Sequence, residues 1–485
     1  MKGLKEIAIY KHKILFFSIS LLLISSHFPF LIADPDIDMT MGSRGPWTDE
    51  GLYASQIRNY LLTGNFDIAE CDNFLKTPLL SLYWLLLFSL FGAKLFIARF
   101  GITILTYIML LLIYRLFSNS IFPLFFLLST YTISTVHQHS HFAMAEVASS
   151  LFIVLSGLLL SSYIAKQKPQ WIPLSILCIG ASIGFKVQFI YVAILPFLSI
   201  RIFHILHNNY QLPIKKILAY TILLLLMYLT LLYLPFIDTW QSISQNQSGG
   251  IELHQINLET IKHNIIKVFL LKRNRFITIV FLLSILTTAY YHKNLRTTPH
   301  YFFLALFSLS WFLVEMHKII MGYLPVRYYV SIYISMGLFI TTTASFMYSH
   351  IPTFKKIHLS YLLIFPLAAF NNYTIIIAHN RRTFQLHHAQ QIVATYPHHL
   401  THAIGPWAPS LCWESQLPTY PLWRHFGNEN ILKDTTRTII IFSENDEIDS
   451  DSAFYSRSII LQKEAIMNDS FPLSNWQVNS YYLPK

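Results

Sequence analysis

The run Thr48-Asp49-Glu50-Gly51-Leu52-Tyr53 places two adjacent carboxylates just outside the first strongly apolar segment of the chain. An aspartate with a reference pKa of about 3.9 is ionised at neutral pH and can take a proton from an attacking hydroxyl. Such base catalysis typically contributes about 10²–10⁴-fold to a rate. Carboxylates of this kind could serve as general bases, but the local pattern alone assigns that role to neither of them. The alternative is that both are ordinary acids in the first turn of an interfacial helix, where the helix dipole favours negative charge.

A short amphipathic helix is predicted to hold these carboxylates. Thr48 can cap its start, and an apolar stripe repeats at helical spacing from Tyr53 to Leu61. The segment is too short and too polar to span a bilayer, and Gly64 can end it. We therefore expect the two carboxylates in the first turn of a helix that lies in the membrane interface.

Four cations lie near the predicted outer ends of apolar segments, namely Arg58, Lys76, Lys186 and Arg327. Fixed cations of this kind can stabilise negative charge that develops on a leaving group. Lys186 is the most informative, because it sits between two apolar runs with almost no polar loop. A cation at the bilayer centre costs about 2.5–3.5 kcal/mol on insertion scales. The depth of Lys186 in the bilayer therefore bears on whether it has a function. The structural alternatives are a snorkelling lysine at 186 and an interfacial anchor at Arg327.

Other polar residues lie beside the same segment ends. Glu146 begins an apolar segment and could be a binding residue or a first-turn acid without a task. Tyr53 and Tyr328 could donate hydrogen bonds to an anion, although an interfacial aromatic belt explains them as well. Glu315, His317 and Lys318 are expected to pair with one another, in a structural role.

The composition restricts the class of protein. The 485 residues are 54% hydrophobic and only 12% charged, whereas a soluble domain carries about 25% charged residues. An all-α polytopic membrane protein is the class that fits. The net charge of +11 does not indicate nucleic acid as a partner, because the basic residues gather at the ends of apolar runs, as orientation signals do.

The histidines and cysteines of the sequence show no pattern that identifies metal ligands. The 21 histidines show no HExxH or similar metal-binding spacing. Three cysteines exclude a disulfide framework. Cys71 and Cys412 both fall outside in the predicted topology, so they could form a bridge or remain free thiols.

Eleven membrane-spanning helices are predicted, and the N-terminus is placed in the cytoplasm because four lysines precede the first span. The apolar segment 79–91 is short for a span and is expected to lie in the interface, within an external loop of residues 34–93. This choice puts the basic pairs between spans on the cytoplasmic side and the C-terminus outside. The predicted spans are 14–33, 95–114, 119–136, 145–164, 171–185, 187–205, 216–237, 276–291, 301–319, 329–348 and 357–377.

Two further external regions are predicted. Residues 258–275 carry an apolar stripe and five cations, so they are expected to form an interfacial helix at the lipid phosphates. Residues 1–378 are interpreted as the transmembrane domain. Residues 379–485 are more polar and are expected to form a small soluble α/β domain with strands at 438–442 and 458–461.

The first external loop resembles that of glycosyltransferase family 39, which contains the protein O-mannosyltransferases and the lipid A aminoarabinose transferases. That family has an acidic-start helix, a "TGDW"-like end and a "KPPL…YW" segment. The matching residues here are Asp49-Glu50-Gly51-Leu52-Tyr53-Ala54, Thr63-Gly64-Asn65-Phe66, Lys76-Thr77-Pro78-Leu79-Leu80 and Tyr83-Trp84. Less specific matches follow in order at Phe91-Gly92, Ala98-Arg99-Phe100, His141-Phe142-Ala143-Met144-Ala145-Glu146, Gly184-Phe185-Lys186 and Val326-Arg327-Tyr328-Tyr329. The resemblance covers most of residues 13–350.

The resemblance implies an inverting transferase of the GT-C membrane fold. It would take a sugar from a polyprenyl-phosphate donor and pass it to a lipid, glycan or protein acceptor outside the cytoplasmic (inner) membrane, with membrane lipids as further partners. By that analogy Asp49 is the catalytic base, and Glu50 and Glu146 bind the acceptor. The donor phosphate is then bound by Tyr53, Arg58, Lys76, Lys186, Arg327 and Tyr328.

The sequence departs from the family pattern at several positions. Thr77 replaces the first proline of "KPP", and Glu146 stands where aspartate is common. Leu75 stands where the aminoarabinose transferases carry glutamate, so that subfamily's metal site is not carried over. No cofactor is assigned, and a requirement for a divalent cation stays open. The loop 238–275 is too short for the inserted sugar-binding domain of eukaryotic mannosyltransferases, which favours a bacterial type.

Two other functions remain open at this point. A transporter or flippase for a lipid-linked glycan would often show internal repeats and charged residues within spans. The nearly charge-free spans and external acids favour the enzyme. A structural membrane subunit that binds a partner through residues 379–485 is the second alternative.

Overall fold

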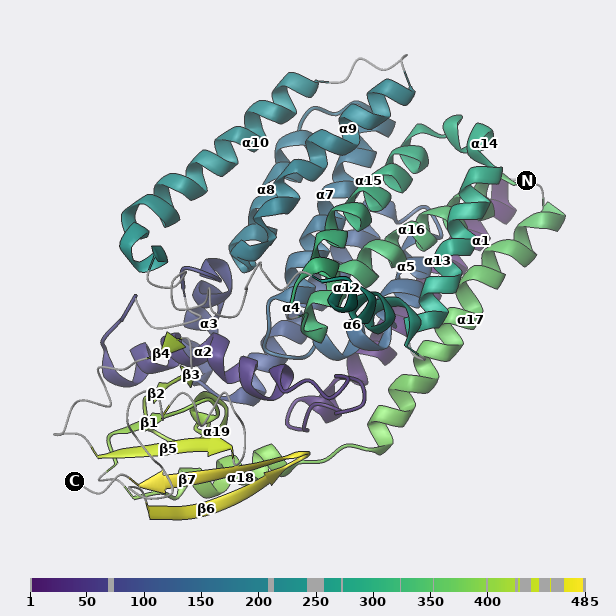
Figure 1. Cartoon of the computed structure of the whole chain (residues 1–485). Helices are drawn as coiled ribbons and strands as arrows, with labels where there is room; N and C mark the ends of the chain where they lie inside the picture. Colours follow the sequence, from purple (N-terminus) through teal and green to yellow (C-terminus); the bar gives the residue numbers. More distant parts are fainter. Residues whose placement is uncertain are drawn as a thin grey trace.

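The computed structural model is a bundle of long helices with a small mixed sheet at one end (Figure 1). It describes residues 2–68, 74–207, 213–241, 257–271, 274–322, 324–351, 353–397, 400–423, 426–427, 438–444, 454 and 466–482. Several predictions fall outside the described residues, namely the partner cysteine Cys71, the strand at 458–461 and the cations Lys272 and Arg273.

Every predicted span contains a helix, although the span predicted at 14–33 leaves its long helix at Ser25 and the span predicted at 119–136 is interrupted by turns. Eight segments in this part of the chain are long and apolar enough to cross a membrane, which makes the chain a multi-pass membrane protein. They contain α1 (Lys2–Ser25), α4 (Leu95–Phe117), α7 (Glu146–Lys166), α9 (Leu195–Leu206), α10 (Ile214–Tyr228), α15 (Pro299–Glu315), α16 (Tyr329–His350) and α17 (Thr353–Asn380).

Three predicted spans correspond to shorter apolar helices, Phe122–Tyr131, α8 (Trp171–Phe185) and α13 (Asn274–Tyr290). The segment expected in the interface forms the similarly short α3 (Pro78–Phe91). Helix length alone therefore does not separate these spans from α3, and the total of eleven stays a prediction.

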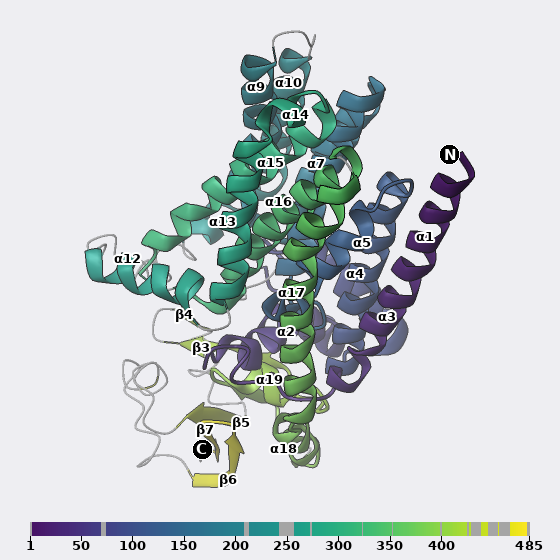
Figure 2. The same cartoon turned by 90° about the vertical axis from the view of Figure 1, so that its right-hand side faces the viewer.

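The centre of the bundle is formed by α16 and α7, which are almost completely buried, whereas α10 and α1 expose most of their length. A helix that is apolar all round belongs in the interior of such a bundle, and one that faces lipid exposes its apolar side chains. The predicted pairing of Glu315 with Lys318 is confirmed, at 2.5 Å between the carboxylate and Nζ. The segment expected at the lipid phosphates forms α12 (Leu258–Ile265), which projects from the side of the bundle (Figure 2).

The helix that carries the two carboxylates, α2 (Gly45–Thr63), differs from its prediction in two respects. It begins before Thr48, with Pro46 in its first turn, so Asp49 and Glu50 lie in the second turn. Residues 45–59 are all buried, so α2 is not an amphipathic helix on a membrane surface. The physical reason is that the C-terminal region covers the side of α2 that would otherwise meet solvent. Its predicted end is confirmed, because Gly64 adopts a left-handed conformation with φ of 74°.

The C-terminal region forms a five-stranded sheet of order β2-β1-β5-β7-β6, with β1 parallel to β2 and β5 and the other pairs antiparallel. Its strands are β1 (His402–Ile404), β2 (Thr419–Tyr420), β5 (Ile439–Glu444), β6 (Ile466–Leu473) and β7 (Trp476–Tyr482). Beside it lie α18 (Gln385–Ala394), α19 (Ala408–Leu411) and the short pair β3 (Leu422–Trp423) and β4 (Phe426–Gly427). The predicted strand at 438–442 is confirmed as β5.

Two contacts fix this region to α2. Gly51 lies so close to residues 409–410 that a Cβ on it would meet the Pro409 carbonyl group at 2.4–2.5 Å. Asn59 exchanges two hydrogen bonds of 2.8 Å with the backbone of Thr419. The helix is therefore held between the membrane bundle and the sheet.

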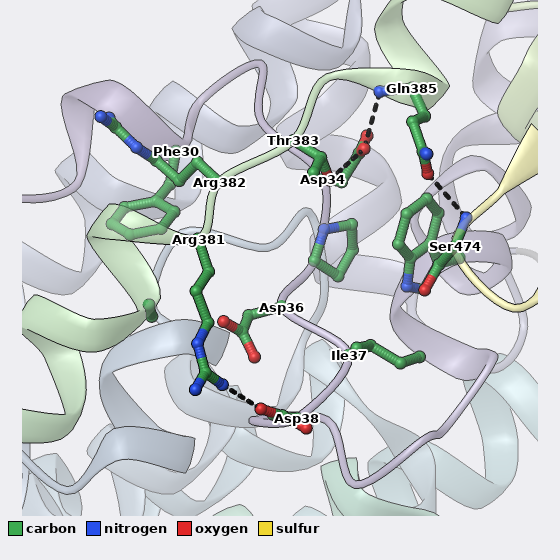
Figure 3. A pocket seen from close by; sticks show the side chains of 13 residues that line it. Phe30, Asp34, Asp36, Ile37, Asp38, Arg381, Arg382, Thr383, Gln385 and Ser474 are labelled. Carbon is green, nitrogen blue, oxygen red and sulfur yellow. Dashed lines mark hydrogen bonds and ion pairs between the residues drawn. The ribbon is translucent and has the colours of Figure 1, made fainter.

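A third contact joins the loop after α1 to the start of α18 (Figure 3). The Asp34 carboxylate accepts hydrogen bonds from the Thr383 hydroxyl and from the backbone N–H groups of Gln385 and Leu386, at 2.7–2.9 Å. These N–H groups have no partner inside the helix, so Asp34 caps α18 from a distant part of the chain.

Candidate active site

Charged side chains from four separate elements meet at one end of the bundle. Asp49 comes from α2 and Glu146 from the start of α7. Lys186 follows α8, and Arg327 lies in the short helix η9 (Val326–Tyr328) before α16. The structure thus brings together two carboxylates and two cations that are separated by up to 278 positions in the sequence.

These four groups form a connected set of ion pairs. Arg327 Nη1 pairs with Asp49 Oδ2, and Arg327 Nε lies 3.7 Å from Glu146 Oε1. Lys186 Nζ pairs with the same Glu146 oxygen. The Lys186 and Glu146 side chains are 3% and 1% exposed, whereas those of Arg327 and Asp49 are 15% and 11% exposed. Asp49 and Arg327 are thus the more accessible end of the set.

Both predicted tyrosines lie against this set. The Tyr53 hydroxyl lies 3.1 Å from Lys186 Nζ, and Lys186 lies over the Tyr328 ring at 5.0 Å from its centroid. Arg327 packs against the same ring at 5.3 Å. Such cation–π contacts stabilise a cation without neutralising its charge, so both cations remain able to attract an anion.

Lys76 is linked to the segment that follows Lys186 through a backbone hydrogen bond. Its carbonyl oxygen accepts a hydrogen bond of 2.9 Å from the N–H of Val187, the residue after Lys186. The segment before α3 therefore runs beside the segment after α8. The Lys76 side chain is 9% exposed.

Arg58 does not belong to this cluster, so its predicted contact with a donor phosphate has no support in the structure. Its guanidinium donates to three backbone carbonyl oxygens of the C-terminal region, those of Leu417, Cys412 and Ser415, at 2.5–2.8 Å. A fully buried guanidinium needs such partners to offset its lost hydration. Arg58 therefore holds the C-terminal region against α2.

Glu50 has a different environment from its neighbour Asp49. Its carboxylate receives two hydrogen bonds from Arg99 of α4, Nε to Oε1 at 2.9 Å and Nη2 to Oε2 at 2.5 Å, and one of 2.7 Å from the Ala143 N–H. Arg99 Nη1 also donates to the carbonyl oxygens of Phe30 and Ala33. Both side chains are buried, so the pair ties α2 to α4 and to the loop after α1.

The sequence analysis did not assign a role to Arg99, although a signal was available. It is the only charged residue between Leu95 and Ile113 in an apolar segment. A charged residue within a span needs a partner, and here the partner is Glu50.

The sequence analysis also missed His139, in the short helix α6 (Ser134–His139). Its Nδ1 lies 2.8 Å from the Thr135 carbonyl oxygen. Because a carbonyl oxygen can only accept, Nδ1 carries the hydrogen and Nε2 is an acceptor. His139 Nε2 and Glu146 Oε2 are both fully buried and have no hydrogen-bond partner among the described residues. Two such acceptors near one another fit a group that donates hydrogen bonds, such as a hydroxyl.

The charge state of His139 leads to a first prediction. Burial lowers its pKa to about 4, although the nearby Glu146 carboxylate acts in the opposite direction. The unfolded chain, with a pKa of 6.5, binds this proton first as the pH falls, so the native state loses stability between pH 6.5 and 4. We expect a loss of about 2 kcal/mol at pH 5 from this residue. Thermal unfolding of purified protein at pH 7.5 and pH 5 would measure it.

His139→Gln, which cannot titrate, should reduce this pH-dependent loss of stability, and the exposed His388→Gln should leave it unchanged. Some loss will remain, because burial also lowers the pKa of His137, to about 3. An identical pH dependence in wild type and His139→Gln would contradict the assignment.

No group of three or more His, Cys, Asp or Glu side chains able to hold a metal ion is found among the described residues. The structure therefore assigns no ligands to the divalent cation that the resemblance allows. The arrangement consists of a carboxylate at the less buried end, two cations that can hold an anion, and two acceptors for a hydroxyl.

Comparisons with known proteins concern the fold. Neither the family models nor the curated proteins give a match to the sequence. The chain is similar to the crystal structure of ArnT from Cupriavidus metallidurans in the apo state, with a TM-score of 0.58, 12% identity and coverage of 98% of each chain. It is also similar to the same protein bound to undecaprenyl phosphate, with a TM-score of 0.54, 12% identity and coverage of 97% of this chain and 98% of that one. ArnT is a lipid A aminoarabinose transferase of the GT-C type. The chain therefore shares the fold of ArnT, which agrees with the fold that the resemblance of the first loop implied.

Proposed function

We propose that this chain is an inverting membrane glycosyltransferase that moves a sugar from a polyprenyl-phosphate donor to an acceptor hydroxyl or phosphate outside the inner membrane. The observation that carries the proposal is the cluster of Asp49, Arg327, Glu146 and Lys186 at one end of a fold shared with ArnT. One ArnT structure holds undecaprenyl phosphate, which supports a polyprenyl-phosphate donor here.

In the proposed reaction the donor phosphate binds Arg327 and Lys186, with Tyr53 and Tyr328 around them and Lys76 at the edge. Because the phosphate competes with Asp49 for the Arg327 guanidinium, donor binding frees the Asp49 carboxylate. The acceptor oxygen then attacks the anomeric carbon, its proton passes to Asp49, and the bond from that carbon to the phosphate oxygen breaks. The leaving phosphate keeps the electron pair, and the two cations stabilise its charge.

Glu146 and His139 are proposed to bind the acceptor, through the two buried oxygen and nitrogen atoms without a donor. Glu50 is proposed as a positioning residue, because both of its oxygens are occupied by Arg99 and the Ala143 N–H. We further infer that residues 1–378 form the membrane domain with a cytoplasmic N-terminus. Residues 379–485 then form a domain outside the membrane, on the side of the catalytic loop.

The proposal is tested with purified protein in lipid vesicles that contain synthetic polyprenyl-phosphate sugars. Loss of donor with release of free polyprenyl phosphate, dependent on added acceptor extract, is the expected result. Movement of intact donor between the two leaflets without turnover would instead establish the transporter alternative.

A prediction concerns Gly45, one turn before Asp49. A Cβ at this position would meet Arg327 Nη1 at 2.7 Å and Asp49 Oδ2 at 2.9 Å. Gly45→Ala should therefore displace this ion pair, and we expect donor turnover to fall about 10- to 100-fold, because small misplacements of reacting groups are costly. Turnover assays of the variant in vesicles would check this.

Stability should change little in Gly45→Ala, since the displaced atoms are the ends of flexible side chains and alanine suits a helix. The matched control is Gly64→Ala, where a Cβ meets nothing within 4 Å but the φ of 74° is unfavourable for alanine. We expect this control to lose stability and to keep turnover. Normal turnover in Gly45→Ala together with reduced turnover in Gly64→Ala would show that Gly45 does not shape the site.

A further inference from the structure

Two adjoining cavities lie between α4, α7 and α8, away from the cluster of Asp49. The larger has a volume of about 660 Å³ and is mainly apolar. The smaller has a volume of about 300 Å³, and most of the residues that line it are polar or charged. They share Arg115, Leu116, Ser162 and Lys166, so together they form one site with an apolar groove and a polar end.

The helices place this site at the opposite end of the bundle from the candidate active site. α4 carries Arg99 near its start and Arg115 in its last turn, and α7 carries Glu146 at its start and Lys166 at its end. At 1.5 Å per residue these pairs are about 24 Å and about 30 Å apart along their helices. α8 returns from Trp171 in the groove toward Lys186. A separation of this size matches the hydrocarbon thickness of a bilayer, about 30 Å.

The groove is open to the side of the bundle. Its lining includes Leu112, Leu174 and Leu177, which are 43%, 44% and 63% exposed. Side chains of this kind on the outside of a membrane bundle face lipid tails. A chain from the surrounding bilayer can therefore enter the groove along its length and replace lipid-exposed apolar surface.

The polar end carries positive charge. Arg115 and Lys166 are exposed, and neither has an ion-pair partner among the described residues. Ser118, Ser120 and Ser162 supply hydroxyls beside them, and no acidic side chain of the described part lines either cavity. Two cations with adjacent hydroxyls and no carboxylate form a site for a phosphate group.

We propose that this site binds a phospholipid of the surrounding bilayer with an anionic head group, its phosphate between Arg115 and Lys166 and an acyl chain in the groove. The site lies on the leaflet opposite the catalytic cluster, so it is separate from donor binding. A phospholipid is favoured because the groove opens directly to the bilayer, in which phospholipids are the main component. The inference does not rest on the proposed glycosyltransferase activity, since it concerns a different set of residues.

The experiment is native mass spectrometry of the purified full-length protein in detergent, titrated with phosphatidylglycerol. We expect one tightly bound phosphatidylglycerol per chain, and phosphatidylethanolamine, which has no net charge, to bind more weakly. The double variant Arg115→Gln with Lys166→Gln should weaken the tight site about 30-fold, from the usual contribution of two basic residues near a lipid phosphate. The single variant Lys168→Gln is the matched control. It removes a cation from the same loop that does not line either cavity, and binding should match wild type.

A second variant tests the groove independently of charge. Ala181→Phe places an aromatic ring in the groove where Ala181 is only partly buried, so the ring should displace the acyl chain and weaken phosphatidylglycerol binding. Equal binding by wild type and the double variant would overturn the assignment of Arg115 and Lys166. Equal binding of the two phospholipids would overturn the requirement for an anionic head group. Tighter binding of undecaprenyl phosphate than of phosphatidylglycerol, lost in the same double variant, would overturn the choice of occupant.

Discussion

Asp49→Asn is expected to lower donor turnover by about 10²–10⁴-fold, the usual contribution of a general base. The amide keeps the shape of the side chain but cannot take the proton of the acceptor. Removing the negative charge beside Arg327 also leaves the guanidinium more available to a phosphate, so donor affinity should stay equal or rise. The measurement is donor turnover in vesicles, combined with a separate binding assay for the polyprenyl-phosphate sugar.

Asp38→Asn provides the matched control for this prediction. Asp38 also pairs with an arginine, Arg381 (Figure 3), but both side chains are more than half exposed and neither belongs to the four-residue cluster. An exposed pair contributes little to stability, so turnover and unfolding should stay close to wild type. Normal turnover in Asp49→Asn would remove Asp49 as the base and leave Glu146 as the carboxylate to test.

Arg99→Met is expected to have the largest effect on stability, a loss of about 3–5 kcal/mol in the free energy of unfolding. Arg99 is completely buried, and the substitution leaves the Glu50 carboxylate without its bidentate partner. It also removes the donor to the Phe30 and Ala33 carbonyl oxygens. Because α2 carries both Glu50 and Asp49, the loss should loosen the helix that positions the proposed base. Thermal unfolding of the purified protein, with its yield as a monodisperse species, would measure the change.

Arg99→Met could lose stability because the attraction to Glu50 is gone or because the Glu50 charge is left buried without a partner. The double variant Glu50→Leu with Arg99→Met distinguishes these two causes. Replacing both members of a buried ion pair by apolar residues is often nearly neutral, so the double variant should regain much of the stability that Arg99→Met loses. If the double variant were less stable than the single one, the backbone contacts of Arg99 would matter more than the charge of Glu50.

The apolar segments of this protein could be located from the sequence because each helix in a membrane must satisfy its own backbone hydrogen bonds. Length and apolarity then define a span without reference to its neighbours. The same reasoning identified Gly64 as the end of α2 and residues 438–442 as a strand, since these signals depend on local backbone preferences.

The family resemblance also pointed to four charged residues that the structure places in one cluster. Asp49, Lys186, Arg327 and Glu146 were all predicted site residues, and the structure brings them together. Residue type and position at a span end predicted these four, but the same two features also selected Arg58, which lies outside the cluster.

Only the tertiary structure decided how adjacent or similar residues differ. Asp49 and Glu50 are neighbours on one helix, yet one faces Arg327 in the more accessible part of the site and the other is buried against Arg99. Arg58 and Arg327 looked equivalent as outer cations, yet Arg58 bonds to backbone carbonyls of the C-terminal region. Such roles depend on partners from 49 to 359 positions away, which local sequence cannot encode. The surface location predicted for α2 was wrong for the same reason, since the C-terminal region buries the face that its sequence pattern assigned to the membrane interface.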